Sequence, residues 1–131
     1  MSNFSQVVGA TPIFHVPDGQ KAADYYKEVL GFTLAWGMDD PLTFCKMERG
    51  NLSIFLFQTP DAASNTYRTA LSAKFADLYV FVSDVDAIYT ELKERGADCL
   101  AEPKDYDYGM RDFNVRDLNG YILTFGQEVH R

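Results

Sequence analysis

The amino-acid sequence predicts an α+β fold in which one unit, a strand followed by a helix and three more strands, occurs twice. Two amphipathic helices are expected, and each of them follows an apolar strand-like segment and ends at a glycine. The series of strands and turns that follows the first helix is repeated after the second. At 131 residues the chain is long enough for a single domain, residues 1–131, that buries about two-thirds of the surface of its unfolded form.

The first unit is expected over residues 7–58. Residues 7–16 are mostly apolar and predict its first strand. Asp18 is a suitable N-cap, and the apolar side chains of residues 19–30 fall on one helical face, so a helix is expected there before Gly31. Three further strand segments joined by short turns predict an antiparallel meander: 32–36, 42–48 and 52–58.

The second unit is expected over residues 76–127. Residues 76–82 predict a strand, Ser83 or Asp84 the N-cap of a helix, and Gly96 the end of that helix. The apolar face of this helix is formed by Val85, Ile88, Tyr89 and Leu92. The remaining segments are expected to be strands at 99–101, 110–116 and 121–127 and a loop at 103–109.

Landmarks of the first unit recur in the second at a nearly constant distance. Val16 and Asp18 return as Val82 and Asp84, 66 residues later. Two such units can curl their sheets around one enclosed space, so we expect a curled mixed sheet around a central cavity. The polar and aperiodic residues 59–75 are expected to link the two units.

Composition bears on the classes of partner. A net charge of −7 and a pI near 4.6 argue against nucleic acid, because phosphate binding requires clustered Lys and Arg. No apolar stretch approaches the roughly eighteen residues of a membrane span, and the first residues lack the order of a secretion signal. We therefore expect no membrane partner and a cytoplasmic location. The two cysteines, Cys45 and Cys99, are expected to be buried free thiols.

Three segments resemble, in their order and spacing, the vicinal-oxygen-chelate superfamily of glyoxalases, extradiol dioxygenases and bleomycin-resistance proteins. They are an opening stretch (Pro12, Val16-Pro17-Asp18, Ala22, Tyr25-Tyr26, Leu30-Gly31-Phe32), the restart Val82-Ser83-Asp84-Val85-Asp86 and the closing stretch from Arg111 to Gly120. The resemblance covers roughly residues 7–127 and implies two repeated βαβββ units. Within the superfamily the chain looks closest to bleomycin-resistance-like proteins, because of the sequence around Pro12 and the Tyr108-Gly109 pair before Arg111.

The resemblance also implies where enzymes of the superfamily hold a divalent metal ion that activates the substrate's oxygens. The four ligand positions, typically His or Glu, fall here on Thr11, Phe55, Asp77 and Thr124. Of these only Asp77 is a good ligand, so we predict no metal, no other cofactor and no metal-dependent chemistry. His15 shares a strand face with Thr11, and together with Asp77 it leaves open a two-ligand metal site or an acid/base pair.

Strand alternation predicts an aromatic and mildly acidic inner surface. Ser53 and Phe57 share the face of Phe55, Tyr79 and Phe81 share that of Asp77, and Ile122 shares that of Thr124. Such a surface suits a flat or cationic organic ligand through stacking and cation–π attraction, although the same rings could simply fill the core.

The predicted ligand-binding residues come from this surface, from His15 and from three further positions. Trp36 is a candidate as a large aromatic, and the resemblance places a ligand-stacking aromatic at Tyr108. Arg111 is expected either to form a salt bridge with Asp77 or Asp112 or to hold an anionic group. The complete set is His15, Trp36, Phe55, Phe57, Asp77, Tyr79, Tyr108 and Arg111.

Pro12 bears on the oligomeric state. The resemblance implies a kink at this position that lets the first strand cross to a partner subunit, which gives a strand-exchanged homodimer. The alternative is an ordinary proline in an edge strand, where a missing backbone donor is tolerated.

These observations lead to three hypotheses about function. The leading one is a metal-free, bleomycin-resistance-like protein that confers antibiotic resistance by sequestering an aromatic or cationic small molecule. The second is a divergent metal-dependent enzyme of the glyoxalase or dioxygenase type, centred on His15 and Asp77. The third is a scaffold that dimerises with another protein.

Overall fold

The computed structural model describes residues 6–60 and 75–129 and contains two helices and two sheets. The elements of the first half are β1 (Ile13–Val16), α1 (Gly19–Glu28), β2 (Thr33–Met38), β3 (Phe44–Arg49) and β4 (Leu52–Gln58). Those of the second half are β5 (Leu78–Phe81), α3 (Val85–Glu94), β6 (Asp98–Cys99), β7 (Lys104–Asp105), β8 (Met110–Arg116) and β9 (Ile122–Glu128). The predicted α+β class is therefore confirmed.

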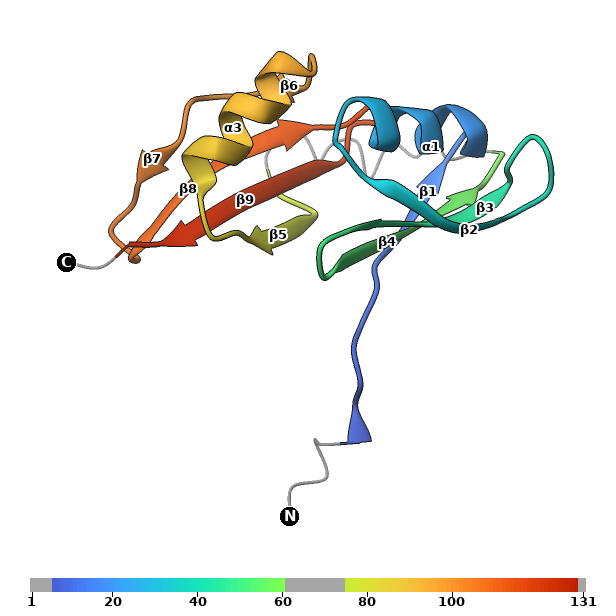
Figure 1. The fold of residues 1–131 in the computed structure, drawn as a ribbon, viewed down its shortest axis with the longest axis horizontal. Coiled ribbons are helices and arrows are strands. Elements are labelled where there is room, and N and C mark those ends of the chain that lie inside the picture. Colours follow the sequence, from blue (N-terminus) through green and yellow to red (C-terminus); the bar gives the residue numbers. More distant parts are fainter. Residues whose placement is uncertain (1–5, 61–74, 130–131) are drawn as a thin grey trace.

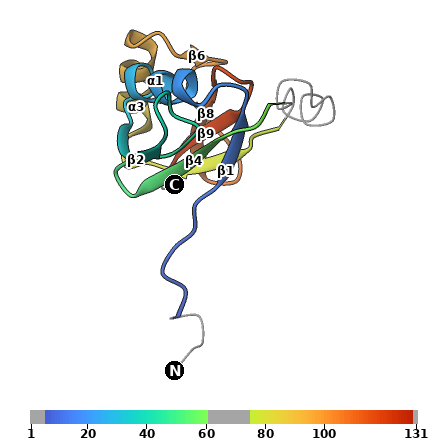
Figure 2. The ribbon, with the colours of Figure 1, turned by 90° about the vertical axis from the view of Figure 1, so that its right-hand side faces the viewer.

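Each half forms one mixed sheet with a helix on one side. Sheet A has the strand order β1-β4-β3-β2, and sheet B has the order β5-β9-β8-β6, with β7 also paired to β8. The first strand of each half runs parallel to the last one, and the other pairs are antiparallel. Both helices lie on the same side of the two sheets, so the opposite faces of sheets A and B share the other side of the molecule (Figures 1 and 2).

The same hydrogen bonds start both helices. The carboxylate of Asp18 accepts the backbone N–H of Lys21 at 3.0 Å, and that of Asp84 accepts the N–H of Ala87 at 3.1 Å. A glutamine near the end of the last strand then satisfies the first helical amide: the side-chain oxygen of Gln58 accepts from Gly19, and that of Gln127 accepts from Val85, both at 2.9 Å. The internal repeat thus extends to individual hydrogen bonds.

The hydrophobic core lies between the sheets and their helices. Alternate strand residues point toward the helices and are buried, among them Met47, Leu56, Val115 and Leu123. The core is continuous across both halves and includes Tyr26 of α1 and Leu92 of α3.

The β8–β9 turn joins the second half to the first. Asp117 accepts the N–H groups of Asn119 and Tyr121 through Oδ1, at 2.8 and 2.9 Å, and the hydroxyl of Tyr26 through Oδ2 at 2.6 Å. The ring of Tyr121 stacks on Phe14 with a centroid distance of 4.0 Å, so the turn is fixed to both β1 and α1.

The β3–β4 turn makes the reciprocal connection. Arg49 forms a bidentate salt bridge with Glu91 of α3, with distances of 2.7 and 2.8 Å, and donates a further bond to the carbonyl of Leu30. Arg95 binds the same carboxylate and the carbonyl of Glu28. The Arg49 guanidinium, by its hydrogen bonds to Glu91, lowers the pKa of this carboxyl group.

Three sequence expectations about the elements need correction. The first strand covers Ile13–Val16 instead of residues 7–16, and residues 6–10 are exposed and extend away from the body (Figure 1). The loop expected at 103–109 contains β7, which is held by pairing with β8 and therefore has no apolar pattern of its own. β2 continues through Met38, where we expected a turn.

Other boundaries agree closely with the expectations, and part of the linker is not described. β4 and β8 have the expected ends, and α1 ends at Glu28 because Val29 acts as its C-cap. Most of the expected linker 59–75 falls on residues 61–74, outside the described part of the chain.

We predict that Tyr26→Phe destabilises the protein by about 1.5–3 kcal/mol, because it removes a hydrogen bond to a buried carboxylate. The measurement is the free energy of unfolding in urea. Tyr25→Phe is the matched control, since its hydroxyl makes only a long bond of 3.4 Å to an exposed backbone carbonyl. Equal losses of stability in the two variants would contradict the central role of the Tyr26–Asp117 bond.

Candidate ligand-binding site

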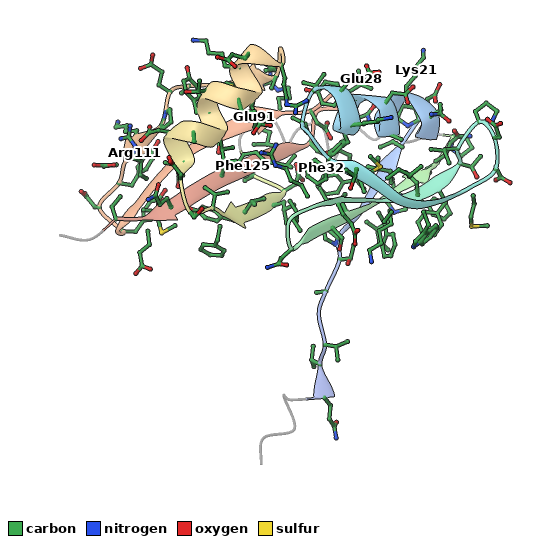
Figure 3. The ribbon with its side chains drawn as sticks, in the orientation of Figure 1. Lys21, Glu28, Phe32, Glu91, Arg111 and Phe125 are labelled. Carbon is green, nitrogen blue, oxygen red and sulfur yellow. The ribbon has the colours of Figure 1, made fainter. Side chains whose placement is uncertain are left out.

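The face of sheet A that points away from α1 carries a row of aromatic rings. Strand pairing places Phe44 opposite Phe57 and Phe57 opposite His15, and the bulge in β2 turns Trp36 to the same side. We call Trp36, Phe44, Phe55 and Phe57 the aromatic face. Figure 3 shows side chains projecting from sheet A on this side of the molecule.

The rings of the aromatic face are in mutual contact. Phe44 is the centre, with centroid distances of 5.2 Å to Trp36, 5.3 Å to Phe55 and 5.2 Å to Phe57. The His15 ring continues the row at 5.8 Å from Phe57. Its Nδ1 lies 2.8 Å from the hydroxyl of Thr59, which fixes the orientation of the imidazole.

The rings of this face are partly open to solvent, and the face also carries Lys46, which lies opposite Phe55 and binds Glu48 at 3.6 Å. Trp36 is 42 % exposed and Phe57 is 44 % exposed, and the neighbouring Ile13 and Met38 are more than half exposed at 54 % and 53 %. A contiguous apolar surface of this kind is typical of a binding site. The rings contact each other at tilted and edge-on angles. They therefore support one another through these contacts, while part of each ring remains available to a ligand.

The corresponding face of sheet B is polar and is centred on Asp112. This carboxylate is only 6 % exposed, and its Oδ2 accepts the hydroxyls of Tyr79 at 3.0 Å and Tyr108 at 2.7 Å. We call these three residues the Asp112 cluster. A Cβ on Gly126 would overlap the Tyr79 hydroxyl, so the absence of a side chain there lets Tyr79 cross the strand to reach Asp112.

The Asp112 cluster changes the acidity of its tyrosines. Desolvation, reinforced by the hydrogen bond to Asp112, raises the pKa of Tyr108 to about 12. The same two causes, in the same order, raise the pKa of Tyr79 above its ordinary value. Both phenols therefore stay protonated to a higher pH than a free tyrosine does, and both donate to the carboxylate.

The structure brings some of the predicted site residues together and separates others. Phe55, Phe57, Trp36 and His15 share the aromatic face, and Tyr79 and Tyr108 meet at Asp112. Asp77 is exposed and accepts the N–H of Ile122 through Oδ2 at 2.9 Å.

Arg111 does not form the salt bridge that we expected with Asp77 or Asp112. Its guanidinium binds Asp86 at 2.9 Å and Asp105 at 3.2 Å, because successive residues of a strand point to opposite faces and Arg111 therefore points away from Asp112. It lies at the end of sheet B that is farthest from α1 (Figure 3).

The residues at the four metal-ligand positions do not fit a catalytic metal ion. Phe55 has no donor atom, the Thr11 hydroxyl is bonded to Ser53 at 2.8 Å, and the Thr124 hydroxyl donates to Asn114 at 2.6 Å. In residues 6–60 and 75–129, no three His, Cys, Asp or Glu side chains are placed to hold a metal ion together. The available donors are hydroxyl groups and one carboxylate, which do not make a site for zinc, nickel or iron.

Sequence reasoning missed two residues of this surface. Phe44 was not selected, although the register of a short hairpin places it opposite Phe57. Asp112 was considered only as a partner for Arg111. Its importance depends on Tyr79 and Tyr108 reaching it from β5 and from the β7–β8 loop, a contact that no local pattern reveals.

A pocket of about 680 Å³ lies apart from the aromatic face, at the junction of the two halves. It is lined by the β3–β4 turn, by β5 and by the start of α3, and Tyr79 is the one predicted site residue in its wall. The described helices include none that is long and apolar enough to cross a membrane.

Comparisons with known proteins identify relatives over nearly the whole chain. A family model described as the Glyoxalase/Bleomycin resistance protein/Dioxygenase superfamily matches residues 9–125. The uncharacterized protein YraH of Bacillus subtilis is 27 % identical over 115 residues, which cover 82 % of this chain and 88 % of YraH.

Solved structures of the same fold include a bleomycin-binding protein, a bleomycin resistance determinant and a glyoxalase-related enzyme. The bleomycin-binding protein of Streptomyces verticillus, complexed with copper(II)-bleomycin, has a TM-score of 0.68 at 20 % identity and covers 95 % of this chain and 98 % of its own. The bleomycin resistance determinant encoded on transposon Tn5 has a TM-score of 0.71 at 21 % identity, with coverages of 93 % and 98 %. A glyoxalase-related enzyme from Clostridium phytofermentans has a TM-score of 0.72 at 17 % identity, and the match covers 94 % of this chain and 96 % of that enzyme.

We predict that Asp112→Asn lowers the pKa of Tyr108 from about 12, since the substitution removes a negative charge and the acceptor that favours the protonated phenol. Because the pKa of Tyr108 is higher in the folded protein, its protonated phenol contributes its full stabilisation at pH values below the unfolded pKa of about 10. This contribution is lost as the pH rises from there through about 12. Carbon-13 NMR of the tyrosine rings measures the titration. Asp86→Asn is the control, because Asp86 binds Arg111, and equal titration curves in all three proteins would argue against the cluster.

Proposed function

Because the chain belongs to the glyoxalase/bleomycin resistance protein/dioxygenase superfamily, we propose that it binds a small aromatic or cationic organic molecule and sequesters it without a metal ion. The observation that supports this most directly is the aromatic face, a set of exposed rings in mutual contact. Residues unsuited to metal at the four ligand positions favour binding over metal-dependent catalysis.

The aromatic face fits a flat ligand. A planar molecule laid on Trp36 and Phe57 covers apolar surface that is now in contact with water, and this transfer provides the main favourable free energy. If the ligand carries a positive charge, the negative faces of the same rings attract it. This cation–π attraction adds about 0.5–1 kcal/mol at an exposed site and about 2 kcal/mol when the cation is shielded from water.

Charge also favours a cation over an anion. The chain has a net charge of −7, so its overall field attracts positive ligands. On sheet B, the Asp112 carboxylate adds a fixed negative charge on the face that points away from α3, because its neighbour Arg111 points toward Asp86 of that helix. Bleomycin-type resistance by sequestration is the physiological role that we propose, by similarity to the bleomycin-binding protein and the Tn5 determinant.

We further propose that the functional form is a homodimer in which the segment before β1 packs on a second copy. Val7 is 71 % exposed and Val8 is 102 % exposed, and both lie on an extended segment that leaves the body of the molecule (Figures 1 and 2). Two exposed valines ahead of a strand-start proline are suited to cover apolar surface elsewhere or to extend a sheet edge.

The dimer proposal predicts that changing Val7 and Val8 together to Asp shifts the protein to monomer in sedimentation-velocity experiments. The reason is that two charges cannot be buried at an apolar contact. Leu118→Asp serves as a control, since Leu118 is similarly exposed at 52 % on the β8–β9 turn. A wild-type protein that sediments as a monomer at micromolar concentrations would refute strand exchange.

For ligand binding, we predict that a planar aromatic cation such as proflavine quenches the fluorescence of Trp36, the single tryptophan of the chain. Trp36→Ala should weaken binding about two- to twelvefold in calorimetry, because ring contacts contribute about 0.5–1.5 kcal/mol beyond buried area. Leu118→Ala should leave the affinity unchanged. The proposal fails if neither proflavine nor bleomycin binds, or if Trp36→Ala binds as tightly as wild type.

A further inference from the structure

The repeat creates two equivalent junctions between the halves. Phe14 of β1 pairs with Leu56, and Val80 of β5 pairs with Phe125 in the same parallel register. Phe14 and Val80 therefore occupy equivalent positions, 66 residues apart. Leu56 and Phe125 are 69 residues apart, and the same distance makes Leu52, the first residue of β4, equivalent to Tyr121.

The first junction is filled by an aromatic ring. Tyr121 stacks face to face on Phe14, with a centroid distance of 4.0 Å and an interplanar angle of 1°. Its hydroxyl accepts the backbone N–H of His15 and donates to the carbonyl of the same residue, each at 2.8 Å. A phenol held by one strand residue thus closes this junction.

The second junction has no ring in the equivalent place. Leu52 stands where the first junction has Tyr121, and Val80 stands where it has Phe14. Both replacements are smaller, and the pocket of about 680 Å³ lies at this position, with Leu52, Val80, Val82, Ile88 and Phe125 in its wall. The volume falls in the range of small-molecule sites, which is roughly 300–1,000 Å³.

The hydrogen-bonding groups of the first junction have counterparts in the second. Phe81 is equivalent to His15, and it also lines the pocket. β5 is an edge strand paired with β9, and the N–H of Val82 donates to Gly126 at 2.8 Å. Because backbone groups of successive strand residues point in opposite directions, the N–H and C=O of Phe81 point to the open edge of β5.

We propose that this pocket binds a planar aromatic molecule with a hydroxyl group, in the way that Tyr121 fills the other junction. The ring lies against Val80, and the hydroxyl exchanges hydrogen bonds with the backbone of Phe81. A single phenol ring is small for the space, so the fitting ligands are phenols with two or more fused rings. None of the residues of the aromatic face lines the pocket, so this site is separate from the one proposed above.

The experiment uses 2-naphthol as the probe and the intact wild-type chain. We expect saturable binding in NMR titrations, with the largest amide shifts at Phe81 and its neighbours in β5. Naphthalene, which lacks the hydroxyl, should bind about five- to tenfold more weakly, the equivalent of one hydrogen bond of about 1 kcal/mol.

Leu52→Tyr tests the location, because the larger side chain occupies the pocket as Tyr121 occupies its own junction. Binding of 2-naphthol should fall at least tenfold, while Leu118→Tyr, an exposed control on the equivalent turn of the other half, should not change it. Trp36→Ala should leave this affinity intact, which separates the pocket from the aromatic face.

Three results would overturn the inference. They are the absence of saturable binding by wild type up to millimolar 2-naphthol, equal affinities for naphthalene and 2-naphthol, and amide shifts at the residues of the aromatic face with none in β5 or at the start of α3. The shift pattern of the wild-type chain decides the question independently of the folding of Leu52→Tyr.

Discussion

The carboxylate of Asp117 is the constraint on which the arrangement of the two halves depends. It holds its own turn through two backbone amides, and through Tyr26 it ties that turn to the helix of the other half. The Tyr26 hydroxyl is buried, and desolvation together with Asp117 raises its pKa well above the ordinary value, so it remains a donor. Tyr121 is positioned by the same turn and reaches β1. Because both halves are fixed in this way, the faces of sheets A and B that the helices leave uncovered lie on one side of the molecule (Figure 1). The aromatic face belongs to sheet A and the Asp112 cluster to sheet B.

In the proposed binding function, the aromatic face would provide apolar area and the Asp112 cluster would provide charge. Rings in mutual contact lose little conformational freedom when a ligand binds, because they are already held by their neighbours. The carboxylate of Asp112 is likewise fixed in advance by two phenols. The proposal of binding without a metal ion rests on the hydroxyl and hydrocarbon side chains at the superfamily's ligand positions.

Much of the fold could be predicted from the sequence because its causes are local. Asp18 and Asp84 cap helices as expected, and strands β4 and β8 follow apolar alternation to their ends. β7 could not be predicted, since it exists only through its pairing with β8. For the site, alternation correctly grouped Phe55 with Phe57 but gave no information about which neighbouring strand each ring would meet, and so Phe44 was missed. Arg111 binds Asp86 and Asp105, which come within reach only because α3 packs on sheet B and β7 pairs with β8.

The glutamines at the ends of β4 and β9 show how such a chain can arise. Each accepts a hydrogen bond from the first amide of the helix in its own half. The last strand of a unit therefore satisfies a backbone donor near the beginning of the same unit. A segment with that property can be copied in tandem, because the copy brings every group needed to finish its own boundaries. After such a duplication, the residues at the two junctions between the copies need not be identical. The difference between Tyr121 and Leu52 at equivalent positions is an example.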